Sequence, residues 1–316
     1  MMDVRKEFET IVKAAEQLGT DASRFLDKRF ASIIISGNRV IGLNNVPGLR
    51  LTHESIENGV KVDIVVEDGA EIPLPVHVCT GYVEKKGYQR VVFNIRVGKG
   101  AKVKFVAHCV FPQVEEFTHE AISNVLVEEG GFMEYSDEHY HSDAGTITLK
   151  TTTNATVRKD GIYKNEFHLT KTRVGKLDVR MFLTLEENSV GELVSKVKAS
   201  QNDEVDINEV VYLNGEAARG LAKTVVVGLD RARVNVVNEA YGNAPHSRAH
   251  ISCEEITKGD EVVVSTTPIL KITNDLAELT HEASIGRVNQ KQLETLMAKG
   301  LTEDEATDLV IKGLLV

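Results

Sequence analysis

The sequence of 316 residues has no tryptophan, few aromatic residues (5%) and three cysteines, Cys79, Cys109 and Cys253. Sugar-binding sites usually stack their ligand on aromatic rings, so this composition counts against a carbohydrate-active enzyme. The three cysteines lie far apart in the sequence, which makes a disulfide framework unexpected. A reducing cytoplasm fits this cysteine content best.

Long apolar runs are also absent, and none approaches the roughly 20 residues of a membrane-spanning helix. The N-terminus, MMDVRKEFETIVKAAEQLG, lacks the pattern of a signal or transit peptide. The formal charge of −10 argues against a protein whose main task is to grip a phosphate backbone. We therefore expect a cytoplasmic protein whose partners are neither membrane nor nucleic acid.

Several catalytic motifs are missing. There is no P-loop, since the nearest string, VGKGAKVKF, lacks the lysine–hydroxyl ending that holds phosphate and magnesium. The G-x-S-x-G elbow, the C-x-x-C pair and H-E-x-x-H are absent as well. We expect no nucleotide bound by this chain and no ATPase activity of its own.

The middle of the sequence is typical of β-strands. From about residue 32 to 273, short runs rich in β-branched residues are separated by Gly, Asn or Asp turns. Phe93, Ile95 and Val97 alternate with polar residues, as in a strand with one buried face. No convincing helix interrupts this stretch, which disfavours an α/β fold. Although no clean repeat is visible, the steady turn spacing favours a parallel β-helix over sandwiches or barrels.

Both ends of the sequence are typical of helices. Apolar residues recur at helical spacing from Val4 to Leu18. Near the other end, one helix should open at Asn289 and close at Gly300, and the next should run from a capping box at Thr302 to Gly313. We expect an N-terminal helical segment over residues 1–31, a β-helix core over 32–275 and a C-terminal helical region over 276–316. The helical segments would cover the open ends of the solenoid.

Glu138-His139-Tyr140-His141 is a candidate metal site. In a strand His139 and His141 point to the same face, where both imidazoles can bind one metal ion. Adjacent carboxylates (Glu134, Asp137 and Asp143) would add oxygen ligands. A polar solvent-facing strand or a hydrogen-bonded turn remains the structural alternative.

Cys253 lies near two histidines and an arginine, His246, Arg248 and His250, which would favour its reactive thiolate form. His281 and Glu282 follow Cys253 by 28 and 29 residues. One turn of a β-solenoid takes about 20 to 30 residues, so this spacing can bring the three onto neighbouring turns. A thiolate, an imidazole and a carboxylate together suit iron. A buried core cysteine and a capping turn are the alternatives, and for Cys79 and Cys109 the core reading is preferred.

The C-terminal part of the sequence contains the segments RAHISCEEI and LTHEASIGR, with YLNGEAARG further upstream and a final helical stretch. Together these segments resemble the SufB/SufD family of iron–sulfur cluster assembly scaffolds. It implies a mainly β fold, a right-handed parallel β-helix flanked by helical terminal segments. It also implies that a transient, nascent iron–sulfur cluster is assembled at Cys253, His281 and Glu282. Because the chain is short, it is similar to the compact archaeal or anaerobic-bacterial type, which would pair with itself.

The resemblance further implies a set of partners: a second copy in a homodimer, a sulfur donor, apo-protein acceptors and a SufC-like ABC ATPase. The ATPase would dock on the C-terminal helices, where we single out the apolar residues Leu293, Leu296, Leu309 and Val310. The chain itself would be a scaffold rather than an enzyme. Two other functions stay open: a β-helix carbohydrate-active enzyme, and a metal-binding structural module built on Glu138, His139 and His141.

Overall fold

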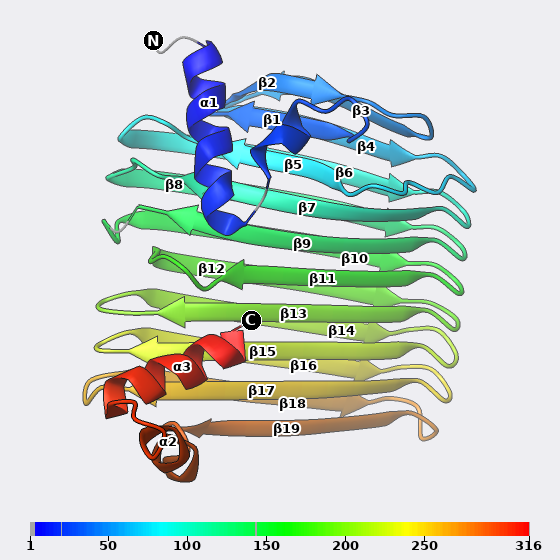
Figure 1. The fold of residues 1–316 in the computed structure, drawn as a ribbon. Helices are drawn as coiled ribbons and strands as arrows, with labels where there is room; N and C mark the ends of the chain where they lie inside the picture. Colours follow the sequence, from blue (N-terminus) through cyan, green and yellow to red (C-terminus); the bar gives the residue numbers. More distant parts are fainter. Residues whose placement is uncertain (1–3, 20, 143, 316) are drawn as a thin grey trace.

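The protein is a β-solenoid with helices at both ends of the chain, in a computed structural model that describes residues 4–19, 21–142 and 144–315 (Figure 1). Successive strands alternate between two sheets, named A and B here. Within the described residues sheet A has ten strands and sheet B nine. The predicted mainly β solenoid is confirmed.

The strand order follows the winding of the chain. Sheet A consists, in spatial order, of β2 (Arg39–Asn44), β1 (Ser32–Ser36), β5 (Val76–Gly81), β7 (Lys102–Phe111), β9 (Phe132–His141), β11 (Ile162–Leu169), β13 (Val190–Ala199), β15 (Arg219–Leu229), β17 (Arg248–Lys258) and β19 (Glu278–Gly286). Sheet B consists of β3 (Leu49–Ile56), β4 (Gly59–Val66), β6 (Lys86–Val97), β8 (Glu116–Val127), β10 (Ile147–Val157), β12 (Gly175–Leu185), β14 (Glu204–Leu213), β16 (Arg233–Gly242) and β18 (Val263–Ile272). Neighbouring strands are parallel except in the hairpins β1–β2 and β3–β4.

The core lies between the two sheets. In β12, for example, Leu177, Val179, Met181 and Leu183 face inward and are buried, while the residues between them face outward. Parallel pairing keeps this alternation in phase from one turn to the next, because paired residues point to the same side. The interior is therefore one continuous apolar cluster along the solenoid.

A hidden repeat lies in the turns that lead from sheet B to sheet A. In each of these turns from β4–β5 to β16–β17, one residue has a positive φ and donates its N–H to a carbonyl of the next turn. These residues are Gly69, Gly100, Gly130, Asp160, Asn188, Ala217 and His246. The turns thus stack on one another by backbone hydrogen bonds, although the residue type at the position changes from glycine to aspartate, asparagine, alanine and histidine.

The N-terminal helices cover part of the outer face of sheet A. Helix α1 (Val4–Ala15) is followed by the short 3₁₀ helices η1 (Glu16–Leu18) and η2 (Ala22–Phe25). Ile11 of α1 packs in a buried cluster with Ile34 and Cys79 of the sheet. The end of the solenoid itself is formed by the antiparallel strands β2 and β3. We expected α1 to cover this open end, but it lies beside sheet A instead (Figure 1).

The C-terminal helices also lie on sheet A. Helix α2 (Gln290–Met297) is capped by Asn289, and Thr302 and Glu305 form the predicted capping box before α3 (Glu303–Leu315). The predicted helix end at Gly313 is wrong, because α3 continues to Leu315, where it packs on Val225 and Val227 of β15. Strand β19 pairs with β17, so sheet A extends beyond residue 275 into the range expected to be helical.

Membrane insertion by a helix finds no support in the described part of the chain. None of its helices has both the length and the apolar character needed to cross a membrane.

The repeated turn gives a prediction about stability. Ala217 adopts φ 56° and Gly130 adopts φ 65° at equivalent positions, in a region that costs a residue with Cβ about 1–2 kcal/mol. We expect Ala217→Gly to raise, and Gly130→Ala to lower, the stability of the chain by about 1 kcal/mol each. A Cβ on Gly130 would meet no atom closer than 3.9 Å, so backbone strain alone is tested. Urea unfolding midpoints that move in the same direction would contradict this account.

Candidate functional site

The last two strands of sheet A hold the three residues singled out in the sequence. Strands β17 and β19 pair in parallel, with Cys253 opposite Ala283 and Ile251 opposite His281. The expectation that the two segments lie on neighbouring turns is therefore met. Cys253 faces the interior and is buried, whereas His281 lies on the inward side of the edge strand and is exposed.

Glu282 lies on the other face of the strand pair. It is opposite Ser252, whose hydroxyl donates to its Oε1 at 3.4 Å, and it approaches His250 Nε2 to 3.7 Å. The single chain thus brings Cys253 and His281 to the inward side and Glu282 to the outward side. The thiol, the imidazole and the carboxylate therefore lie on two paired strands, but not on one face of the sheet.

A row of buried polar side chains leads to Cys253 through the solenoid interior. Ser195 and Thr224 donate to the two oxygens of Glu209 at 2.5 and 3.1 Å. Asn238 donates to Thr224 Oγ1 at 2.9 Å and approaches Cys253 Sγ at 3.5 Å. Each residue comes from the next strand along the chain, β13 to β17. The row is a continuous hydrogen-bonded chain within an otherwise apolar core.

Burial sets the protonation of this row. It raises the pKa of Glu209 to about 7, against the hydrogen bonds from Ser195 and Thr224. Burial likewise raises the pKa of Glu255 to about 7, against the opposing interaction with the Thr266 hydroxyl. Glu255 is the next inward-facing residue of β17 after Cys253, so a second carboxyl group lies beside the thiol.

The expected thiolate at Cys253 is not found in the single chain. Burial raises the pKa of this thiol to about 11. The positive neighbours named above do not reverse this effect: Arg248 and His250 alternate with Cys253 and so point to the outer face, where Arg248 pairs with Glu278. The local sequence placed these cations near the cysteine without showing that the sheet separates them.

The second candidate, on β9, is buried rather than solvent-facing. His139 and His141 both face inward, with 3.4 Å between His139 Nδ1 and His141 Nε2. Glu138 directly precedes His139 in the strand and therefore points to the outer face. Of the adjacent acids, Glu134 pairs with Lys104 on the outside, and Asp143 lies outside the described residues.

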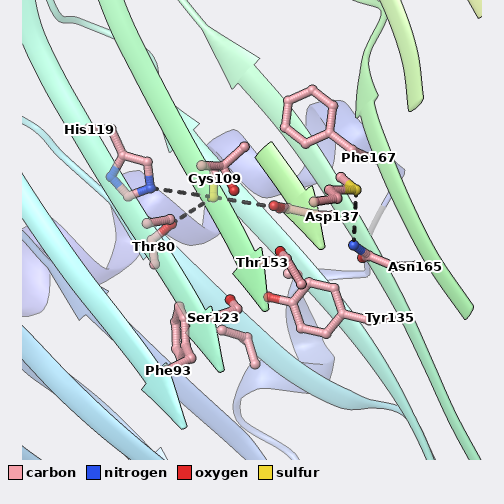
Figure 2. A pocket seen from close by; sticks show the side chains of 15 residues that line it. Thr80, Phe93, Cys109, His119, Ser123, Tyr135, Asp137, Thr153, Asn165 and Phe167 are labelled. Carbon is pink, nitrogen blue, oxygen red and sulfur yellow. Dashed lines mark hydrogen bonds between the residues drawn. The ribbon is translucent and has the colours of Figure 1, made fainter. Parts of the chain in front are cut away.

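Asp137 precedes His139 by two residues and points to the same face of β9. It forms a compact cluster with His139 and Cys109. Cys109 Sγ donates to Asp137 Oδ1 at 3.6 Å and accepts from Thr80 Oγ1 at 2.9 Å (Figure 2). Asp137 Oδ2 lies 3.2 Å from His139 Nε2. The ligand atoms of Cys109, Asp137 and His139 all lie within 4.8 Å of one another, a spacing that can hold a metal ion.

Sequence reasoning treated Cys109 as core and so missed this cluster. Cys109 lies opposite His139 in the β7–β9 pairing, one solenoid turn apart. The sequence shows that Asp137 and His139 share a face, because they lie two residues apart in a strand. It does not show which residues of the neighbouring strand lie opposite them, so it could not add Cys109. Cys79, in contrast, faces outward and is buried under α1, as expected for a core cysteine.

A small cavity adjoins the cluster. The volume open to the centre of a water molecule is ≈ 20 Å³, which is room for about one water molecule. Its lining includes Cys109, His119 and Asp137 together with hydroxyl groups of β8 and β10, and Figure 2 shows these side chains converging on the solenoid interior. Such a cavity admits an ion or a single water, not a large substrate.

The apolar residues singled out on the C-terminal helices have different environments. Leu293 is buried with Val288 and Ala306, and Leu296 and Val310 pack against the same cluster. Only Leu309 of the four is largely exposed, at 48%. Three of these side chains therefore hold the helices together, and one is open to a partner.

Comparison with known proteins identifies the family. Residues 79–314 match the family described as "SUF system FeS cluster assembly, SufBD core domain". The chain belongs to the SufBD family. An iron-sulfur cluster assembly SufBD family protein of Pyrococcus horikoshii is 48% identical, over 98% of this chain and 94% of the relative. A SufBD family protein of Methanocaldococcus jannaschii is 32% identical, over 99% of both chains.

A bacterial relative is longer than this SufBD chain. The iron-sulfur cluster assembly protein SufB of Bacillus subtilis is 24% identical over 82% of this chain but only 54% of its own length. The region that matches the SufBD core begins at Cys79, so it includes Cys109, Cys253, His281 and Glu282. Helix α1 precedes it.

The buried Glu209 gives a prediction about pH. Its pKa is about 7 in the folded chain against an ordinary value of 4.5, so the folded chain binds the proton more tightly. Stability should fall as pH rises between these values, by roughly 3 kcal/mol. Glu209→Gln removes the ionisation and should make the variant more stable than the wild type at about pH 8. At about pH 5 this difference in stability should be smaller.

Thermal unfolding midpoints across this pH range measure the effect. Glu261→Gln, which changes an exposed carboxylate, is the matched control and should follow the wild type. A Glu209→Gln profile parallel to that of the wild type would show that the carboxyl group is ionised or hydrated in the folded state.

Proposed function

We propose that this SufBD chain is a scaffold subunit that receives iron and sulfur and builds a nascent iron–sulfur cluster at its last solenoid turns. The observation that carries the proposal is the register of β17 and β19, which puts Cys253 beside the exposed edge strand bearing His281 and Glu282. Sulfur, nitrogen and oxygen ligands of this kind suit iron. Iron and sulfide are here the cargo of the scaffold.

A second copy of the chain would complete the site. Strands β18 and β19 are the last of their sheets, so each has an edge that no described strand pairs with. Around them Val263, Ile269, Ile272 and Ile285 are exposed. An apolar sheet edge is a surface suited to pairing with another chain. In a homodimer formed here, Cys253 and Glu282 of one copy would lie near His281 of the other.

A SufC-like ABC ATPase is the partner we infer for the C-terminal helices. The outer face of α3 exposes Leu309, while the inner face is fixed to β15. Motion of the helices would therefore be transmitted to sheet A, close to β17. Since the Cys253 thiol is buried with a pKa of about 11, an opening of the last turns is what would let it ionise and meet sulfur and iron. A sulfur donor and apo-protein acceptors would act before and after this step, in the reducing cytoplasm.

Reconstitution with iron and sulfide tests the assembly site. We expect anaerobic reconstitution of the wild-type chain, with its ATPase present, to give sulfur-to-iron charge-transfer bands in the visible spectrum. Cys253→Ala should lose most of this absorbance, because the thiolate ligand is gone. Cys79→Ala also removes a buried thiol, but one on the outer face under α1, and should keep the bands. Full band intensity in a folded Cys253→Ala protein would overturn the assignment.

The docking surface is tested by one exposed side chain. Leu309→Ser should weaken binding of the SufC-like ATPase about tenfold, the effect of removing one apolar contact from an interface. Leu26→Ser is the control, since Leu26 is 73% exposed beside the N-terminal helices. Binding can be measured by titration calorimetry. Equal affinities for the two variants would place the ATPase elsewhere.

A further inference from the structure

The cluster of Cys109, Asp137 and His139 is unusual for a solenoid interior. The exposed fraction of the side chain is 1% for His139 and 16% for Asp137, and Cys109 is buried as well. Asp137 Oδ2 lies 3.2 Å from His139 Nε2, but the contact lacks the geometry of a regular hydrogen bond. The two groups therefore approach each other without being aimed at each other, as two ligands of a common ion are.

The distances come close to those of a four-ligand site. In a tetrahedral zinc site, neighbouring ligand atoms lie roughly 3.3 to 3.8 Å apart, given the metal–ligand bond lengths for sulfur, nitrogen and oxygen. The pairs here measure 3.6 Å from Cys109 Sγ to Asp137 Oδ1 and 3.2 Å from Asp137 Oδ2 to His139 Nε2. His119 Nε2 lies 4.0 Å from Cys109 Sγ, which makes it the nearest candidate for a fourth ligand.

The charges of the cluster also match a divalent cation. On binding, the Cys109 thiol would lose its proton to water, and the thiolate and the Asp137 carboxylate would supply two negative charges. The imidazoles of His139 and His119 would bind in their neutral form. The loaded site would carry no net charge, which is the condition for burying an ion in an apolar core.

We propose that Cys109, Asp137 and His139, with His119 as the fourth ligand, bind one divalent transition-metal ion that accepts sulfur, nitrogen and oxygen ligands, of the class of Zn²⁺ and Fe²⁺. The ion links β7, β8 and β9, two strands of sheet A and one of sheet B, across the solenoid interior. This site is separate from the proposed assembly site, because β9 to β15 lie between Cys109 and Cys253 in sheet A. It does not depend on the proposed function.

Cobalt(II) is a suitable probe, because a thiolate ligand gives it a charge-transfer band. The full-length Cys253→Ala chain is stripped of metal, loaded anaerobically with Co²⁺, and examined by absorption and by metal analysis. We expect one tightly bound cobalt per chain with a thiolate charge-transfer band. Cys109→Ser in the same background should lose the band, and Asp137→Asn and His139→Gln should lose most of the bound cobalt.

Cys79→Ser is the matched control, since it removes the other remaining thiol, one outside the cluster, and should leave both the band and the stoichiometry unchanged. Circular dichroism establishes that each variant is folded. If Cys109→Ser does not fold, the cobalt content of Asp137→Asn and His139→Gln decides. The proposal is overturned if the parent protein binds no cobalt even when refolded with it, or if the folded ligand variants bind as much as the parent.

Discussion

Parallel stacking of equivalent strands is the constraint on which the rest of this structure depends. Each inward side chain of one turn lies directly beside an inward side chain of the next, held by a hydrogen-bond ladder that allows no shift. A polar group on the inward face cannot reach water and must find its partner on an adjacent turn or on the facing sheet. The same register that builds the apolar core therefore also builds rows of polar groups within it.

Two such groups of polar side chains stand out in the described part of the chain, and they differ in chemistry. The row from Ser195 to Asn238 consists of hydroxyl, carboxyl and amide groups that hydrogen-bond to one another, although Asn238 Oδ1 is left without a partner. The cluster around Cys109 consists of groups that approach closely but leave imidazole nitrogens without partners. The first is what a core needs to bury polar residues at low cost. The second leaves polar atoms that the proposed metal ion would pair with.

The fold could be predicted because period-two alternation is a local signal, present within each strand. The repeat could not be seen because the turn position needs only a positive φ, which Gly130, Asp160 and Ala217 all provide with different side chains. The neighbourhood of Cys253, His281 and Glu282 was predicted from their spacing. The face on which each lies was not, because it follows from register. For the same reason Cys109, read from FVAHCVF alone, resembled an ordinary core residue.

The proposed assembly site makes sense of why the two ends of the solenoid differ. At the N-terminal end two antiparallel hairpins complete the sheets, and α1 covers the adjacent outer face. At the C-terminal end the last strands keep exposed apolar side chains, and Cys253 lies one strand inside that edge. A closed end would have sealed the thiol permanently in an environment where it stays protonated. In the proposed dimer a second copy would complete this end, and an opening of the last turns would then expose Cys253, which is buried even in the single chain.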